Sequence, residues 1–298
     1  MIYVFGSLNV DFFMQVEKLP APGETVIGGN YFTAPGGKGA NQAAAAARSG
    51  GVVAMYGAVG DDQWAAIPLT ALADYGVDVS GVRKMTEAGT GYASIMIDAQ
   101  GENTIAVASG ANLKASAEGL KDAGITEDDF LILQMEVNPQ ANWQALEIAK
   151  AAGATTILNV APAAPVPDEA LALVDYLVVN EIEARTVARS LTSESIEEMA
   201  SALSHEHNLI TIVTLGPEGA LAAQGDAITR VASPVVKAVD TTGAGDAFIG
   251  TLVAGLAEGL ELEPALQRSC AGAALACTKQ GAMPSYARRE EILAAMQV

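Results

Sequence analysis

Short apolar segments alternate with helical patterns through the second half of this chain. The apolar segments lie at 130–134, 156–159, 176–179 and 209–214. Strands that are apolar throughout and are separated by helices are typical of a parallel sheet that is buried on both faces. The pattern therefore predicts an α/β fold with an open, mainly parallel sheet and helices on both faces. A length of 298 residues suits one large α/β domain or two small ones, and we expect a single domain from residue 1 to residue 298.

A smaller sheet is expected from two segments in the first third of the chain. Residues 25–33 alternate loosely in polarity and predict a strand, and 91–98 with 103–108 predict a hairpin. Together they indicate a β-sheet lid formed by about 12–34 and 90–108. Two short sheet pieces cannot bury both of their faces alone. We therefore expect the lids of two subunits to pack together in a symmetric homodimer.

The charge and the cysteines limit the partners and the compartment. The formal net charge is −19, from 35 acidic and 16 basic residues, which argues against nucleic acid and anionic membrane surfaces as partners. The sequence shows neither a signal-peptide pattern nor an apolar stretch of membrane-spanning length. Cys270 and Cys277 lie seven residues apart on one predicted helix, roughly 10 Å, which is too far for a disulfide. Two free thiols favour the cytoplasm.

A glycine turn at 240–248 is the strongest candidate for chemistry. The apolar run 235–239 predicts a strand, the glycines Gly243 and Gly245 predict a tight turn, and the apolar spacing after them predicts a helix. The first turn of a helix has unpaired N–H groups and a partial positive charge, which suit a phosphate. Asp246 would lie beside such a phosphate, where it could accept a proton from an attacking hydroxyl. Taken alone, it could also be an ordinary acid at a helix start.

Two further polar clusters lie at predicted ligand-binding positions. Asn9 and Asp11 follow the first strand, at the edge where open α/β sheets bind ligands. A second glycine turn, Gly36-Gly37-Lys38-Gly39, opens a helix, but it lacks the P-loop spacing. The first strand is likewise not followed by the glycine pattern of dinucleotide-binding proteins.

Several of these motifs together resemble the ribokinase-like (PfkB) family of carbohydrate kinases, and within it the ribokinase branch. The resemblance covers essentially the whole chain. It is carried by the stretches GSLNVD at 6–11, LPAPGET at 19–25, GGKGANQA at 36–43, NEIE at 180–183, TLG at 214–216, DTTGAGDAF at 240–248 and GAMPS at 281–285.

The resemblance implies an enzyme that transfers the γ-phosphoryl group of ATP to a sugar hydroxyl, with D-ribose as the expected substrate and D-ribose 5-phosphate as the product. Other members of the family act on deoxyribose, fructose, ketodeoxygluconate or nucleosides, and these substrates remain alternatives. A non-catalytic sugar-binding sensor is a more remote alternative. The implied partners are ATP and a small sugar, with Mg²⁺ as cofactor and K⁺ or a similar monovalent cation as activator.

The resemblance also implies roles for individual residues. Asp246 is the expected base, and the N–H groups of Gly243, Ala244 and Gly245 are the expected anion hole. The expected sugar ligands are Asn9, Asp11, Gly37, Lys38, Asn41 and Glu136, together with Asp246. The residues expected to bind ATP are Asn180, Glu183, Thr214, Gly216, Gly219 and Gly245.

Two metal sites are implied in the same way. Asn180 and Glu183 are expected near Mg²⁺, acting through water, although the pair also has the spacing of a helix capping box. The expected monovalent cation site comprises Asp240, Thr242, Ala276, Lys279, Gly281 and Ser285. Asp240 could instead cap its own turn. Cys270 stands where members of the family often carry a histidine near the adenine.

Overall fold

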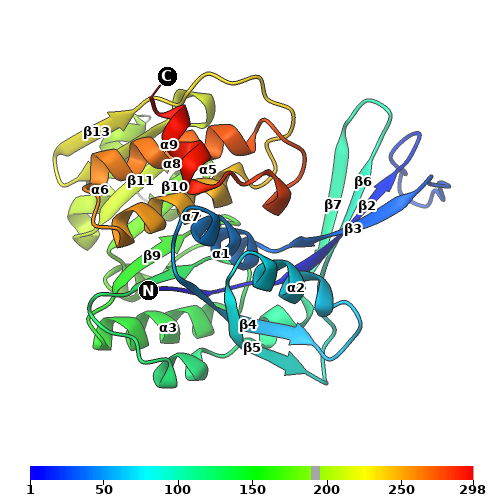
Figure 1. Cartoon of the computed structure of the whole chain (residues 1–298), viewed down its shortest axis with the longest axis horizontal. Helices are drawn as coiled ribbons and strands as arrows, with labels where there is room; N and C mark the ends of the chain where they lie inside the picture. The colour runs from blue at the N-terminus through cyan, green and yellow to red at the C-terminus, as the bar shows by residue number, and fades with distance from the viewer. Residues whose placement is uncertain (189–194, 298) are drawn as a thin grey trace.

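The larger of two sheets forms the body of the protein. The computed structural model describes residues 1–188 and 195–297. Within that part of the chain, nine strands run in the order β13-β12-β11-β10-β9-β8-β1-β4-β5 (Figure 1). They are parallel from β5 to β11, and the hairpin β12–β13 adds two antiparallel strands at one edge. The strand bounds are β1 (Ile2–Phe5), β4 (Val53–Gly60), β5 (Asp78–Met85), β8 (Phe130–Leu133), β9 (Thr155–Asn159), β10 (Tyr176–Asn180), β11 (Ile210–Thr214), β12 (Ala220–Gln224) and β13 (Ala227–Val231).

Helices cover both faces of this sheet, because its strands are apolar on both sides. Ile2 and Val4 of β1 point into one core, and Tyr3 and Phe5 point into the other. The first core is closed by α1 (Lys38–Arg48), α2 (Ala66–Asp74), α7 (Ala244–Ala257) and α8 (Leu262–Ala276). The second core is closed by α3 (Pro139–Ala151), α4 (Asp168–Leu171), α5 (Glu181–Ala188) and α6 (Ile196–His207). The helix α9 (Arg289–Ala295) packs on α8. The predicted fold class is confirmed.

The second sheet projects from the body at the upper right of Figure 1. Its order is β3-β2-β6-β7, with β2 (Asn9–Gln15), β3 (Tyr31–Gly36), β6 (Gly91–Ile97) and β7 (Asn103–Ala108). The outer pairs are antiparallel, and the central pair β2–β6 is parallel. These strands lie in or beside the two segments expected to form the lid.

Two strand predictions were wrong. The strand expected at 25–33 occupies Tyr31–Gly36 instead, because it pairs antiparallel with β2 from Met14 back to Asn9. The run 235–239 is not a strand: the sheet ends at Val231, and Pro234 has no N–H group with which to continue it. Val235 and Val239 of this segment are exposed.

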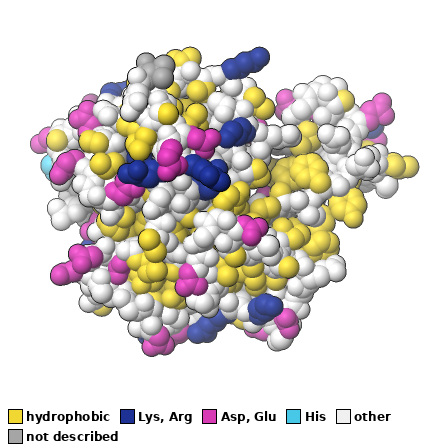
Figure 2. Space-filling view, in the orientation of Figure 1, with side chains coloured by type: hydrophobic (Ala, Val, Ile, Leu, Met, Phe, Trp, Pro, Cys, Tyr) yellow, Lys and Arg dark blue, Asp and Glu magenta, His cyan; other side chains and the backbone are white. Residues whose placement is uncertain are grey.

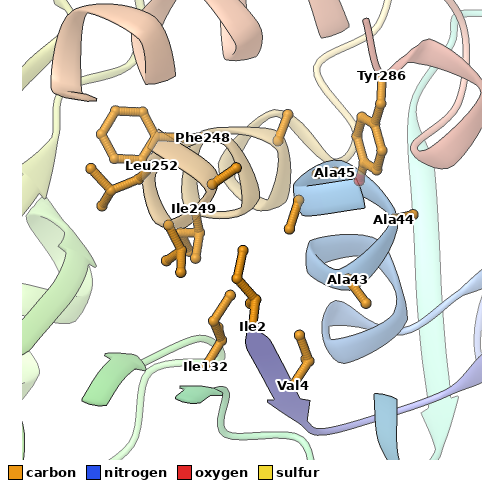
Figure 3. Close-up of a cluster of buried hydrophobic side chains, with 14 of the residues drawn as sticks. Ile2, Val4, Ala43, Ala44, Ala45, Ile132, Phe248, Ile249, Leu252 and Tyr286 are labelled. Atoms are coloured by element: carbon orange, nitrogen blue, oxygen red, sulfur yellow. The ribbon is translucent and has the colours of Figure 1, made fainter. Parts of the chain in front are cut away.

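The helices α1 and α7 pack closely against each other over β1 (Figure 3). Ala45 of α1 lies on the side of α7, whereas Ala43 and Ala44 point away from α7, and all three belong to the same buried core as Ile249. Gly250 makes the approach possible, since a Cβ atom there would lie 2.6 Å from the Gln42 carbonyl oxygen. The start of each helix is thereby fixed relative to the other.

Among the residues that the structure describes, no helix has the length and apolar character needed to cross a bilayer.

Candidate active site

The start of α7 forms the centre of the candidate site. Gly243 caps the helix with a φ of 76°, and a Cβ atom there would lie 2.7 Å from the Tyr286 hydroxyl oxygen. This is a backbone conformation that glycine adopts readily. The Ala244 N–H group, expected in the anion hole, donates to the Thr241 carbonyl at 3.2 Å. Gly243 and Gly245 line a pocket of about 160 Å³ in front of the helix.

Asp246 is buried in the first turn of α7 and lines the same pocket. Its Oδ2 atom accepts a hydrogen bond from Asn41 Nδ2 at 3.0 Å, and its Oδ1 atom accepts one from Gln42 Nε2 at 2.9 Å. Burial raises the pKa of Asp246, and the carboxylate of Glu136 adds to the rise, while Lys38 and the two amide donors oppose it. Asp246 is therefore a carboxylate that two hydrogen bonds hold in place and whose pKa is raised, and both properties suit a general base.

Lys38 and Glu136 lie beside this base. The Lys38 backbone N–H donates to Glu136 Oε2 at 3.0 Å, and Ser7 Oγ donates to the same oxygen at 2.5 Å. Burial alone would lower the pKa of the Lys38 ammonium, but the carboxylates of Asp246, Glu136 and Glu183 raise it above its ordinary value. Lys38 is therefore a firmly charged cation among carboxylates, and its side chain lines the pocket in front of α7.

Asp11 and Asn9 approach from β2, where the small sheet joins the body. Burial raises the pKa of Asp11 to about 7, with further contributions from Glu136 and Asp246. Asn9 is buried, and its Oδ1 atom accepts a hydrogen bond from Asn112 Nδ2 at 2.7 Å. The Asn9 amide oxygen is thus used to hold the base of the small sheet, which leaves its Nδ2 atom for a ligand.

A second, mostly apolar cavity of about 420 Å³ lies on the other side of the α7 start. Thr214, Gly216 and Gly219 line it, as expected for an ATP site, and Cys270 and Cys277 lie in its wall. Another wall includes Val235, Val236 and Ala238, from the run 235–239 that was wrongly predicted to be a strand. Thr214 and Gly245 line both cavities, so the two lie next to each other at the start of α7.

Asn180 and Glu183 form a capping box at the start of α5, which was one of the two alternatives that their spacing allowed. The Asn180 N–H donates to Glu183 Oε2 at 2.8 Å, and the Glu183 N–H donates to Asn180 Oδ1 at 2.8 Å. Burial raises the pKa of Glu183, while the Asn180 N–H group and Lys38 oppose the rise. Both residues also line the pocket in front of α7, so the cap and a functional role are compatible.

Asp240 ties two loops together in the region of the expected monovalent cation site. Its Oδ1 atom accepts from the N–H and hydroxyl groups of Thr242 at 2.9 and 2.7 Å, and its Oδ2 atom accepts from the Gly281 N–H at 2.8 Å. The Ser285 hydroxyl donates to the Ala282 carbonyl, and the Ala276 carbonyl accepts from the Lys279 N–H. The expected residues therefore lie on two segments that Asp240 joins, and donors from Thr242 and Gly281 already occupy both Asp240 oxygens.

The structure places the predicted residues in three neighbouring groups around α7. The group expected to bind the sugar is Asn9, Asp11, Gly37, Lys38, Asn41, Glu136 and Asp246; the group expected to bind ATP is Asn180, Glu183, Thr214, Gly216, Gly219 and Gly245; and the group expected to bind the monovalent cation lies on the Asp240 and Gly281 segments. Ser7 and Gln42 had not been predicted. Both lie inside the recognised motifs, but only the folded chain shows that they touch Glu136 and Asp246.

Comparisons with known proteins agree over nearly the full length. The family model described as pfkB family carbohydrate kinase matches residues 1–288. The chain is 36% identical over 294 residues to the ribokinase of Haemophilus influenzae, covering 97% of this chain and 96% of that protein. It is 34% identical over 295 residues to the deoxyribokinase of Salmonella typhi, with coverage of 97% and 96%. The solved structure of Arabidopsis thaliana ribokinase complexed with ribose and ATP superposes with a TM-score of 0.90 at 32% identity, covering 100% of this chain and 98% of that one.

Proposed function

The chain belongs to the pfkB family of carbohydrate kinases, and we propose that it transfers the γ-phosphoryl group of ATP to D-ribose, giving D-ribose 5-phosphate. The observation that carries the proposal is the placement of Asp246. This buried carboxylate lines the smaller pocket at the start of α7, accepts a hydrogen bond from Asn41, and lies at the helix start that also borders the apolar cavity.

Different residues are proposed to bind the nucleotide and the sugar. The apolar cavity with Thr214, Gly216 and Gly219 receives the nucleotide. Lys38 and the N-terminus of α7 attract its phosphates. On the other side, carboxylate and amide groups of Asp11, Asn41 and Glu136 accept from and donate to the sugar hydroxyls.

Asp246 then accepts the proton of the attacking hydroxyl as the new O–P bond forms. The positive end of α7, with Gly243 and Gly245, stabilises charge on the transferring group. The small sheet closes over the sugar and excludes water, which limits transfer to water. We propose that the chain acts as one kinase unit, with this sheet as its lid.

Asn180 and Glu183 fit a Mg²⁺ ion that is held mainly by the nucleotide and water. The capping box uses Asn180 Oδ1 and Glu183 Oε2, so the second carboxylate oxygen of Glu183 is outside the box, and both residues line the pocket. In the described part of the chain no cluster of three or more His, Cys, Asp or Glu residues could hold a metal by itself. When bound, Mg²⁺ neutralises phosphate charge.

We also propose that K⁺ or a similar cation binds against the Asp240 loops and orders the turn before α7. The carboxylate bridge from Asp240 to Gly281 supports this, because it holds together the two segments whose carbonyls would face the ion. We place the reaction in the cytoplasm, where its phosphoryl donor ATP is available and where free thiols such as Cys270 and Cys277 persist.

A substrate panel tests the proposal. ATP consumption is measured with ribose, 2-deoxyribose, fructose, ketodeoxygluconate, adenosine and pseudouridine, each with and without K⁺. Ribose should give the highest kcat/KM, and K⁺ should raise it. Preference for 2-deoxyribose would favour the second candidate function, which the similarity to the deoxyribokinase supports. Rates that do not respond to K⁺ would contradict the cation site.

The Asp246→Asn variant tests the assigned base. We expect a loss of turnover of about 10²–10⁴-fold, the usual contribution of general-base catalysis, with sugar binding retained. Isothermal titration with ribose provides the control for binding. A variant that keeps its turnover would remove Asp246 from this role.

The homodimer is proposed to form through the apolar face of the lid that includes Phe13. Phe13 of β2 stacks on Phe32 of β3, with ring centroids 4.8 Å apart, and lies beside Ile95 of β6 in the sheet register. Ile105 and Val107 extend this face on β7 and are 54% and 55% exposed. Asp11 lies on the same face by strand alternation, so a partner's lid packed here would also cover the sugar site.

A further inference from the structure

The two oxygens of the Asp246 carboxylate lie in different surroundings. Oδ2 accepts from Asn41, which is 8% exposed and reaches the sugar side of the site. Oδ1 accepts from Gln42, whose side chain is fully buried between α1, α7 and the main sheet. Oδ1 is therefore bound to an amide that solvent does not reach, and Oδ2 to one that is slightly exposed.

The Gln42 amide is held in one orientation by its other partners. Its Nε2 atom also donates to Asn159 Oδ1 at 3.1 Å, and its Oε1 atom accepts from Gln134 Nε2 at 2.8 Å. Asn159 donates to the Val178 carbonyl at 3.1 Å, which fixes its own oxygen toward Gln42. A flipped Gln42 would place its oxygen against the oxygens of Asp246 and Asn159. Both N–H groups of this amide are thus committed, one to the base and one to the sheet.

We propose that Gln42 is a positioning residue for the reaction: it anchors Oδ1 of Asp246 to the main sheet, so that Oδ2 points at the substrate hydroxyl and receives its proton. This inference rests on the proposed function. It goes beyond the roles expected from the sequence, which stop at Asn41. Gln42 is fully buried and so reaches no sugar hydroxyl, and its effect should therefore fall on turnover rather than on sugar binding.

The anchor also controls the proton affinity of the base. The ionisable groups around Asp246 come from several elements and are Lys38 on α1, Glu136 after β8, Glu183 on α5, Asp11 on β2 and Tyr286 before α9. All but Lys38 would favour protonation of Asp246 when charged. Removing a hydrogen-bond donor from a buried carboxylate disfavours its ionised form further, so the pKa of Asp246 should rise.

The Gln42→Met variant tests this, since methionine keeps the length of the side chain and lacks the amide. The control is Asn142→Leu, which removes another fully buried amide, one that donates to the Gln134 backbone carbonyl and to Met135 rather than to Asp246. Turnover of ATP and ribose is measured from pH 5 to 9. The carboxyl pKa of Asp246 is measured separately by ¹³C NMR of aspartate-labelled protein, assigned with Asp246→Asn.

For Gln42→Met we expect kcat to fall about 10- to 100-fold, with KM for the sugar changed less than about threefold. The acid limb of kcat and the carboxyl pKa of Asp246 should both move up by about one pH unit. Asn142→Leu should lose stability without moving either. If Gln42→Met does not fold, Gln134→Met removes the support of the Gln42 oxygen and should give a smaller shift in the same direction.

The proposal is overturned if the Asp246 pKa stays in place in the folded variants, or if the main effect is on KM. The NMR titration needs no substrate, so it separates this proposal from the choice of sugar. A shifted pKa in a protein that phosphorylates no member of the panel would contradict the proposed function and leave the anchor intact.

Discussion

Acidic side chains crowd the sugar side of this site around a single lysine. Asp11, Glu136 and Asp246 repel one another, and Lys38 lies among their charges. The arrangement suits a sugar, whose hydroxyls donate to carboxylates. In a chain with a net charge of −19, Lys38 and the α7 start are the local positive groups that we propose attract the phosphates of ATP. The local charge around the site is therefore different from the net charge of the chain.

At alkaline pH, Asp11 should lower the free energy of unfolding of the protein without bound sugar. Its pKa is raised from 3.8 to about 7, so the folded state holds a proton that the unfolded chain releases near pH 4. Its contribution to stability is then complete below pH 4 and is lost as the pH rises through about 7. We expect Asp11→Asn to stabilise the sugar-free protein at pH 8 by about 1–3 kcal/mol and to abolish sugar binding.

Urea unfolding at pH 8 and pH 4 measures this gain, which should shrink at the lower pH. Asp98 is a control, since it lies in the exposed β6–β7 turn, and Asp98→Asn should show no such gain at pH 8. An equal gain for Asp11→Asn at both pH values would contradict repulsion and burial as its cause.

At the scale of elements, two helix starts from distant parts of the sequence bring the proposed base and its two amide donors together. Asn41 and Gln42 lie in α1, and Asp246 lies in α7, more than 200 residues later. Their hydrogen bonds depend on how closely the two helices approach. Small residues set that distance, with Gly250 against the backbone of Gln42 and Ala46.

Gly250→Ala should therefore disturb both the fold and the site. The new Cβ atom would lie 2.6 Å from the Gln42 oxygen and from the Ala46 nitrogen, where only backbone can move. We expect a loss of about 1–3 kcal/mol in the free energy of unfolding and at least a tenfold lower kcat. Denaturant titration and steady-state kinetics measure the two effects.

Gly255→Ala is the matched control in the same helix. Its Cβ atom would meet the flexible end of Leu260 at 3.3 Å, and alanine favours a helix by up to about 1 kcal/mol over glycine. This variant should keep wild-type kcat with little change in stability. Equal losses in the two variants would show that helix spacing is not the cause.

At the scale of the whole molecule, the small sheet has more apolar surface than one subunit covers. One face packs toward the body, where Phe12 meets Trp64 at 4.9 Å between ring centroids. The other face carries Phe32, Ile105 and Val107, each about half exposed. Figure 2 shows hydrophobic side chains gathered where this sheet meets the body. The exposed face with Phe32, Ile105 and Val107 is an apolar patch of the kind that marks interaction sites.

The Ile105→Glu variant should convert the proposed dimer to a monomer, because it places a charge in the middle of the apolar face. Thr104→Glu is the control, since Thr104 is also exposed but lies on the opposite face of the same strand. Sedimentation velocity at micromolar concentration measures both. If the wild-type protein is itself a monomer, or if both variants dissociate equally, packing through this face is contradicted.

Much of the fold follows from the sequence because its signals are local. Apolar segments separated by helices require a parallel sheet with two cores, and glycines beside Asp246 require a tight turn at a helix start. The strand expected at 235–239 shows the limit of such signals. Its apolar residues suit a strand, but the sheet ends before them, and they line a cavity instead.

Part of the candidate site could likewise be predicted from the sequence, and part of it could not. Asp246, Asn41 and Lys38 were predicted, because their types and motifs indicate phosphoryl transfer to a sugar. The distinction between Asn41 and Gln42 came only from the tertiary structure. The two are neighbours in sequence with similar amides, and one lies toward the substrate while the other is buried against Asn159 and Gln134. Hydrogen-bond partners from remote strands decide such roles, and no local pattern encodes them.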